Sequence, residues 1–181
     1  AFTAMGLEPH SDLPNCTRPP DIQLLYCLAN EATGGGSVFI DAFAVAGELR
    51  AEAPESFALL AETPVTFRFH DAADDIRHSA PVIETDGQGR LTGVRFNNWI
   101  RAALDAPPER ARAWYRAYRA FWQRLREPRF RLILKLTAGQ MVAFDNSRIL
   151  HGREAFDPNS GRRHLQGSYL DWDAERSRRR L

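Results

Sequence analysis

Two histidines and one aspartate have the residue types and the spacing of a metal site. In His10-Ser11-Asp12 an imidazole and a carboxylate are separated by one residue. In an extended segment, residues i and i+2 point to the same side, so both side chains can reach one ion. A third ligand from a distant strand, for which His151 is the candidate, would complete one face of the ion. Two histidines and one carboxylate on one face hold iron(II) and leave other positions open.

An arginine that follows the second histidine extends this pattern. Arg163 lies a short distance after His151, and a guanidinium can hold a carboxylate through two parallel hydrogen bonds. A 2-oxo acid that chelates iron would present its far carboxylate to such a group. The two-residue motif is weak by itself, because it also suits a turn ahead of Pro14. The order of all four residues favours a 2-oxoglutarate site, with Arg162 as the rival to Arg163.

The elements that must position these residues are predicted from hydrophobic periodicity and from turn residues. Strands are expected at 22–28, 37–41, 65–69, 93–97, 131–136, 140–144, 149–152 and 164–169. Helices are expected at 42–50, 54–62 and 107–126, the last capped by Asp105. A polar loop is expected at 71–79 and a hairpin turn at 86–89. The fold class is therefore mainly β with flanking helices, an antiparallel jelly-roll (cupin-like) barrel.

The size and composition fit a single catalytic domain over residues 1–181. Apolar residues make up 44% and charged residues 26% of the 181, and the net charge is +1. This balance predicts no nucleic-acid or membrane partner. The one charge run, at 176–180, is expected to be a solvated end; a nucleic-acid tail is the alternative.

The two cysteines and the start of the chain predict where the protein works. Cys16 and Cys27 are too few for a disulfide framework, and no apolar run reaches the roughly 20 residues of a membrane span. No basic start followed by an apolar stretch marks a signal peptide, so a cytoplasmic location is expected. The chain opens on Ala1 and reaches the metal motif almost at once, so we expect an N-terminal region upstream of it.

Longer stretches around these residues resemble a known family. They are His10-Ser11-Asp12-Leu13-Pro14, Ile22-Gln23-Leu24-Leu25-Tyr26-Cys27, Thr33-Gly34-Gly35, Phe96-Asn97-Asn98, Phe144-Asp145-Asn146, Leu150-His151-Gly152-Arg153 and the segment from Arg163 to Asp173. Together they look like the gamma-butyrobetaine dioxygenase family, which belongs to the taurine dioxygenase-like superfamily of Fe(II)/2-oxoglutarate oxygenases. The resemblance covers nearly the whole chain.

The resemblance implies a double-stranded β-helix fold and the hydroxylation of a trimethylammonium carboxylic acid. The reaction would convert gamma-butyrobetaine, a small-molecule substrate, to L-carnitine with dioxygen. The cofactors implied are Fe(II), 2-oxoglutarate as cosubstrate and ascorbate as reductant. A homodimer is the assembly considered.

Carried over by position, the resemblance also assigns residues. The iron ligands, which are the catalytic residues, would be His10, Asp12 and His151; the cosubstrate would contact Arg163, Leu25 and Ser37; and the substrate would contact Asn97, Tyr169 and Phe2. Aromatic faces suit a quaternary ammonium group, which has no N–H to donate. More ordinary roles are a turn for Asn97, core packing for Tyr169 and a plain strand position for Ser37. His70, His78 and His164 are expected to be structural or exposed.

Two alternatives stay open. Trimethyllysine dioxygenase, or another betaine hydroxylase, would use the same metal and cosubstrate. Arg163-His164-Leu165 followed by Asp171-Trp172-Asp173 favours the butyrobetaine enzyme over it. A non-catalytic barrel that binds betaines or a protein is a different class, and a complete iron triad with its arginine argues against it.

Overall fold

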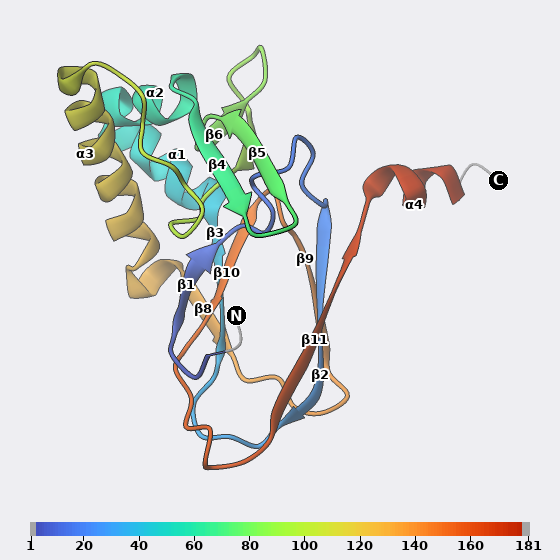
Figure 1. Cartoon of the computed structure of the whole chain (residues 1–181). Coiled ribbons are helices and arrows are strands. Elements are labelled where there is room, and N and C mark those ends of the chain that lie inside the picture. The colour runs from blue at the N-terminus through green and yellow to red at the C-terminus, as the bar shows by residue number, and fades with distance from the viewer. Residues whose placement is uncertain (1–2, 179–181) are drawn as a thin grey trace.

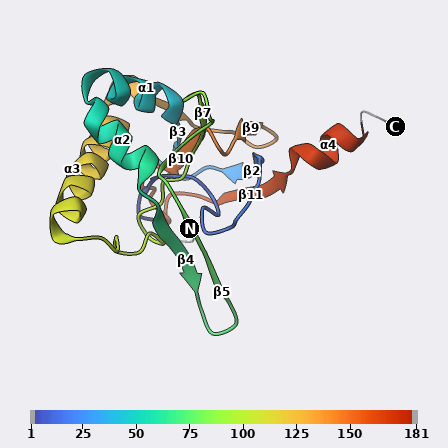
Figure 2. The same cartoon turned by 90° about the horizontal axis from the view of Figure 1, so that it is seen from above.

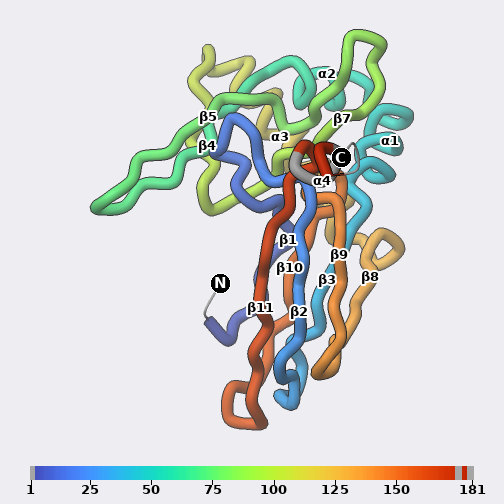
Figure 3. Tube along the Cα trace, turned by 90° about the vertical axis from the view of Figure 1, so that its right-hand side faces the viewer, coloured from blue at the N-terminus to red at the C-terminus, as the bar shows by residue number. Residues whose placement is uncertain are grey.

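Two antiparallel β-sheets face each other in the computed structural model, which describes residues 3–178 (Figures 1 and 3). The first sheet has the strand order β1-β10-β3-β8, and the second has the order β11-β2-β9. The strands of the first sheet are β1 (Leu7–His10), β10 (Ile149–Arg153), β3 (Ser37–Asp41) and β8 (Arg131–Leu134). Those of the second are β11 (Arg163–Leu170), β2 (Ile22–Asn30) and β9 (Met141–Asp145).

Two hairpins stand outside these sheets. They are β4 (Val65–His70) with β5 (Asp75–Ala80), and β6 (Ile83–Thr85) with β7 (Leu91–Val94). The first hairpin projects from the body of the molecule, and the C-terminal helix α4 (Trp172–Arg178) extends away from it on another side (Figure 2).

Three helices cover the outer face of the first sheet. They are α1 (Ala42–Glu52), α2 (Pro54–Glu62) and α3 (Pro108–Leu125). Helix α1 begins at once after β3 because the Asp41 carboxylate accepts hydrogen bonds from the backbone N–H groups of Phe43 and Ala44, at 3.0 and 3.3 Å. Among the described residues, no helix is both long enough and apolar enough to cross a membrane.

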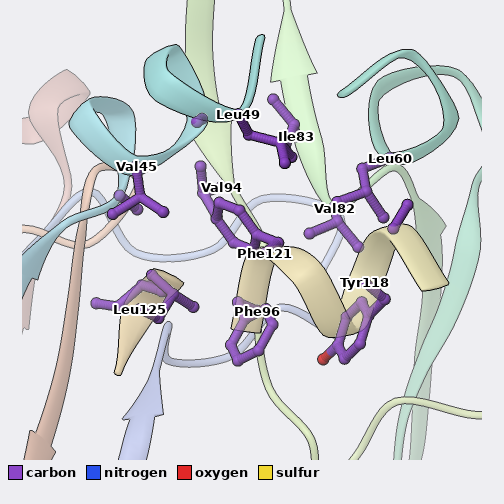
Figure 4. Close-up of a cluster of buried hydrophobic side chains, with 14 of the residues drawn as sticks. Val45, Leu49, Leu60, Val82, Ile83, Val94, Phe96, Tyr118, Phe121 and Leu125 are labelled. Atoms are coloured by element: carbon purple, nitrogen blue, oxygen red, sulfur yellow. The ribbon is translucent and has the colours of Figure 1, made fainter. Parts of the chain in front are cut away.

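The main core lies between these helices and the first sheet (Figure 4). Helix α3 contributes an apolar stripe, and Tyr118 of that stripe stacks on Phe96 with the ring centroids 5.0 Å apart. The fully buried side chains around them include Val38, Ile40, Val45, Leu49, Leu60, Ile83, Trp114, Phe121, Leu125 and Leu150. The core therefore fixes β3 and β10 from one side and leaves their other side to face the second sheet.

The predicted jelly-roll class is confirmed, but several details differ, and β1, β6 and α4 were not predicted. Asp105 does not cap α3: the N-cap residue is Pro107, which forms no side-chain cap bond. Residues before a proline avoid the helical region, so the consecutive prolines 107 and 108 delay the start of the helix beyond the reach of Asp105.

Two predicted segments differ in their strand content. β5 begins inside the loop predicted at 71–79. It is mostly exposed and therefore lacks the apolar alternation of a half-buried strand. The strand predicted at 93–97 is β7 and ends at Val94. The next residues leave the hairpin. The Phe96 carbonyl instead accepts a hydrogen bond from the Ser11 backbone N–H, and the Phe96 N–H donates to the Ser11 side-chain hydroxyl.

Candidate metal centre

The sheet register brings the three predicted metal ligands together. His10 ends β1 and is the cross-strand partner of His151 on β10, while Asp12 follows β1 by two residues. Ligand atoms of the three side chains all lie within 4.8 Å of one another. The Asp12 carboxylate is 3.3 Å from Nε2 of His10 and 3.8 Å from Nε2 of His151. Both histidines are 7% exposed, so the group is largely shielded from water.

Hydrogen bonds hold the triad in an orientation that suits an ion. Nδ1 of His10 lies 2.9 Å from the Glu8 carbonyl oxygen, which leaves Nε2 free for a metal. The backbone around Asp12 is fixed by Asn146, whose Oδ1 accepts from the Asp12 N–H at 2.9 Å and whose Nδ2 donates to the Asp12 carbonyl at 3.0 Å.

The protonation states also fit a metal site. Burial works to raise the pKa of Asp12, but the hydrogen bond with His10, the neighbouring His151 and the hydroxyl of Tyr169 lower it to about 2. Burial, with His10 nearby, lowers the pKa of His151 to about 4, against the opposing effect of Asp12. At neutral pH the site therefore offers a carboxylate and a neutral imidazole, the forms that bind a divalent ion. The donor set fits iron(II).

A cavity of about 350 Å³ between the two sheets contains the triad. It is lined by Leu7, His10, Asp12, Gln23, Leu25, Ser37, His151, Gly152, Arg153, Arg163, Leu165, Gly167 and Tyr169. Seven of the nine residues assigned by resemblance therefore line this cavity, namely His10, Asp12, His151, Arg163, Leu25, Ser37 and Tyr169. A larger open hollow of about 1090 Å³ lies near the other end of β11, and Arg163 borders both spaces. The smaller cavity is the candidate site because the three side chains that could hold a metal ion line it.

Arg163 lies in the cavity wall, whereas Arg162 points to solvent. Burial and the nearby Arg153 lower the pKa of Arg163. Its guanidinium lies 5.2 Å from the centre of the Phe156 ring, and its Nη2 donates a long hydrogen bond of 3.4 Å to the Gly35 carbonyl. The Arg162 side chain is 83% exposed and forms a 3.4 Å ion pair with Glu31. The geometry therefore favours Arg163 for a carboxylate in the cavity.

The other assigned residues fall into two groups. Leu25, Ser37 and Tyr169 line the cavity. The Tyr169 hydroxyl also donates a 2.7 Å hydrogen bond to Asp12 Oδ2, a contact that its sequence position did not predict. Asn97 is not among the lining residues; its Oδ1 accepts from the Trp99 backbone N–H at 3.1 Å, as in a turn. Phe2 lies outside the described residues.

Two further residues at the site were missed. The Trp99 indole meets the His10 ring edge-on, with the centroids 5.3 Å apart. Gln23 is 4% exposed, lines the cavity, and its Oε1 has no hydrogen-bond partner among the described residues. An unpaired buried group of this kind costs about 1–3 kcal/mol. The position of Gln23 two residues before Leu25 on one strand was the available signal, because alternate residues share a face.

Nearly the whole chain also matches known proteins. Residues 1–169 match the family model described as taurine catabolism dioxygenase TauD, TfdA family. The chain belongs to this family. A gamma-butyrobetaine dioxygenase of Pseudomonas sp. (strain AK-1) is 49% identical over 98% of the chain. A mitochondrial trimethyllysine dioxygenase of Gallus gallus is 34% identical over 96% of it.

The chain is shorter than these two relatives. It spans 46% of the Pseudomonas protein and 42% of the Gallus gallus protein. Among solved structures, an asparagine oxygenase in complex with Fe(II), 2S,3S-3-hydroxyasparagine and succinate is similar, with a TM-score of 0.73 at 18% identity. That match covers 96% of this chain and 53% of the other. It confirms the double-stranded β-helix fold.

Proposed function

We propose that the protein is an Fe(II)- and 2-oxoglutarate-dependent dioxygenase that hydroxylates gamma-butyrobetaine to L-carnitine. The observation that supports this most is the cavity that joins His10, Asp12 and His151 to Arg163. A triad that leaves open metal positions, with a guanidinium in the same cavity, is what a chelating 2-oxo acid requires. The 49% identity with a gamma-butyrobetaine dioxygenase supports the choice of substrate.

The residues of the chain position the reactants. His10, Asp12 and His151 would hold iron(II) on one face, and Arg163 would hold the far carboxylate of 2-oxoglutarate. Bound iron supplies the oxidative chemistry, in which dioxygen converts 2-oxoglutarate to succinate and carbon dioxide and hydroxylates the substrate; ascorbate would keep the iron reduced. Leu25 and Ser37 would border the cosubstrate. The protein contributes binding, alignment and the exclusion of water.

The trimethylammonium end of the substrate would lie against aromatic faces. Tyr169 presents its ring in the cavity, and Phe2 is proposed as a second wall. Asn97 is proposed for the substrate carboxylate, through its side-chain Nδ2, because its Oδ1 is already engaged by Trp99. These three roles rest on the match in position with the gamma-butyrobetaine dioxygenases.

Location and assembly complete the proposal. The free Cys16 and Cys27 support a reducing compartment, for which we propose the cytoplasm. We further propose a homodimer that binds neither nucleic acid nor membranes. Size-exclusion chromatography with light scattering measures the mass in solution, and the mass of a monomer would contradict the proposed homodimer.

Product analysis tests the function. Incubation with Fe(II), ascorbate, 2-oxoglutarate and oxygen should give equal amounts of succinate and L-carnitine when gamma-butyrobetaine is present. Succinate that rises with trimethyllysine instead would transfer the proposal to that substrate. A folded, iron-loaded protein that yields neither product with either substrate would support the non-catalytic barrel and end the proposal.

A further inference from the structure

Gln23 faces the metal triad from the opposite sheet. It lies on β2, between its cross-strand partners Tyr169 on β11 and Phe144 on β9. Directly opposed residues point to the same face of a sheet. Tyr169 donates to Asp12 at 2.7 Å, and the Phe144 ring lies 5.2 Å from the His151 ring. Both neighbours of Gln23 thus touch a metal ligand, so its side chain points toward the triad across the cavity.

The amide of Gln23 is buried there with unused hydrogen-bonding capacity. The residue is 4% exposed, and Oε1 has no partner among residues 3–178. Its neighbours do not supply one, since Phe144 has no polar side-chain atom and the Tyr169 hydroxyl gives its proton to Asp12. Buried side-chain amides in proteins almost always have a partner. A polar group that lines a cavity without a protein partner is suited to bind what fills that cavity.

The ligands expected in this cavity determine which bond forms. On the proposed function, both 2-oxoglutarate and the substrate present carboxylates, which only accept hydrogen bonds. An amide presents Nε2 as donor or Oε1 as acceptor by rotation of its terminal bond, with almost no change in shape. A neutral amide can donate to a ligand carboxylate beside Asp12. A positively charged side chain there would instead compete with the metal ion for the Asp12 carboxylate.

We propose that Gln23 is a positioning residue whose side-chain amide donates a hydrogen bond to a ligand carboxylate bound next to the metal. The inference rests on the proposed function for the identity of the ligands. Two ligands carry a suitable carboxylate. One is 2-oxoglutarate, through its end nearest the metal, and the other is the substrate. The experiment separates them because each ligand is titrated by itself.

The test uses Gln23→Met in the full chain, loaded with Mn(II) without oxygen so that no turnover occurs. Methionine has a similar volume and no strong hydrogen-bonding group. Calorimetric titration should show a Kd that is about tenfold or more higher for one of the two ligands, 2-oxoglutarate or gamma-butyrobetaine, the effect of losing a hydrogen bond to a charged group. Gln166→Met is the matched control, since Gln166 is exposed on β11 and does not line the cavity.

Two more readouts exclude a merely structural role. The urea midpoint of Gln23→Met should equal or exceed that of the wild type, because an unpaired buried group is replaced by an apolar one. If the affected ligand is gamma-butyrobetaine, butyltrimethylammonium, which lacks the carboxylate, should bind equally to wild type and variant.

Defined results overturn the proposal. Kd values within twofold of the wild type for both ligands would do so, as would an equal loss for both ligands with a lower urea midpoint. A wild-type protein that binds 2-oxoglutarate but no trimethylammonium acid would contradict the proposed substrate alone. The 2-oxoglutarate titration would then still decide the role of Gln23.

Discussion

Tyr169 makes two separate contacts: its hydroxyl bonds to Asp12, and its side chain lines the cavity. The hydroxyl donates at 2.7 Å, and both burial and this bond to Asp12 raise the pKa of the phenol, which therefore stays protonated as a donor. The resemblance predicted a wall for the substrate; the geometry adds an orienting bond to a metal ligand. Conservative substitution can separate the two.

Tyr169→Phe should weaken metal binding, while its aromatic ring remains in the cavity wall. Bonds of this kind to a ligand are worth about 10- to 100-fold in metal affinity. We expect the Kd for Mn(II) to rise about tenfold, with gamma-butyrobetaine affinity at saturating metal unchanged. Tyr169→Ala should weaken both. An unchanged metal Kd in Tyr169→Phe, measured by competition with a chelator, would show that the hydroxyl does not support Asp12.

Arg163→Ala should raise the 2-oxoglutarate requirement, and Arg162→Ala should not. Arg163 lines the metal cavity, whereas Arg162 is paired with Glu31 at the surface. The loss of a charge-assisted contact predicts a KM for 2-oxoglutarate that is about tenfold or more higher for Arg163→Ala. The KM of Arg162→Ala should stay within twofold of the wild type. The reverse order would reassign the carboxylate to Arg162.

The proximity of His10, Asp12 and His151, the proposed metal ligands, could be predicted from the sequence because it follows from residue type and local spacing. His10 and Asp12 share a face by strand geometry alone, and few other residues could complete the set. Gln23 and Trp99 could not be predicted in the same way. Gln23 reaches the site through the pairing of β2 with β11 and β9, and Trp99 through the contact of its ring with His10. Both depend on contacts between distant segments.

At the scale of elements, the turn between β2 and β3 helps to position the cavity wall that contains Arg163. Gly34 has φ +80° and forms an isolated bridge with Phe156, whose ring lies beside the Arg163 guanidinium. A Cβ at Gly34 would come within 2.4 Å of the Ala155 carbonyl oxygen. This position therefore requires glycine for conformation and for space.

Gly34→Ala should destabilise the protein by about 1–3 kcal/mol, the usual cost of a strained backbone position. Urea unfolding measures this, with Gly87→Ala as the control. Nothing lies within 4 Å of a Cβ at Gly87. The control should therefore stay within about 0.5 kcal/mol of the wild type. Equal stability of the two variants would contradict the description of this turn.

Strong periodicity explains which elements could be predicted. Helix α3 and strand β3 were found nearly to the residue, because apolar stripes bury against one core. The short β1 and the exposed β5 were missed, because pairing with β10 and β4 holds them rather than a hydrophobic pattern of their own. The pairing of β1 with β10 is what aligns His10 with His151, so the element most important to the site had the weakest local signal.

At the scale of the whole molecule, the core and the cavity occupy different faces of one sheet. The helices α1, α2 and α3 pack on one side of β3 and β10, and the metal cavity opens on the side that faces β2 and β11. Side chains of the cavity can therefore change with little effect on the main core. This separation makes a direct test of the metal site possible, because loss of a ligand need not unfold the protein.

Metal stoichiometry tests the central claim most directly. Equilibrium dialysis against Fe(II) without oxygen should give one ion per chain for the wild type and none for His151→Ala. His164→Ala serves as the control, since this exposed histidine lies outside the triad, and it should keep the ion. Circular dichroism should show that all three proteins are folded. A folded wild type without iron, or His151→Ala with full occupancy, would contradict the assignment of His10, Asp12 and His151 as the metal site.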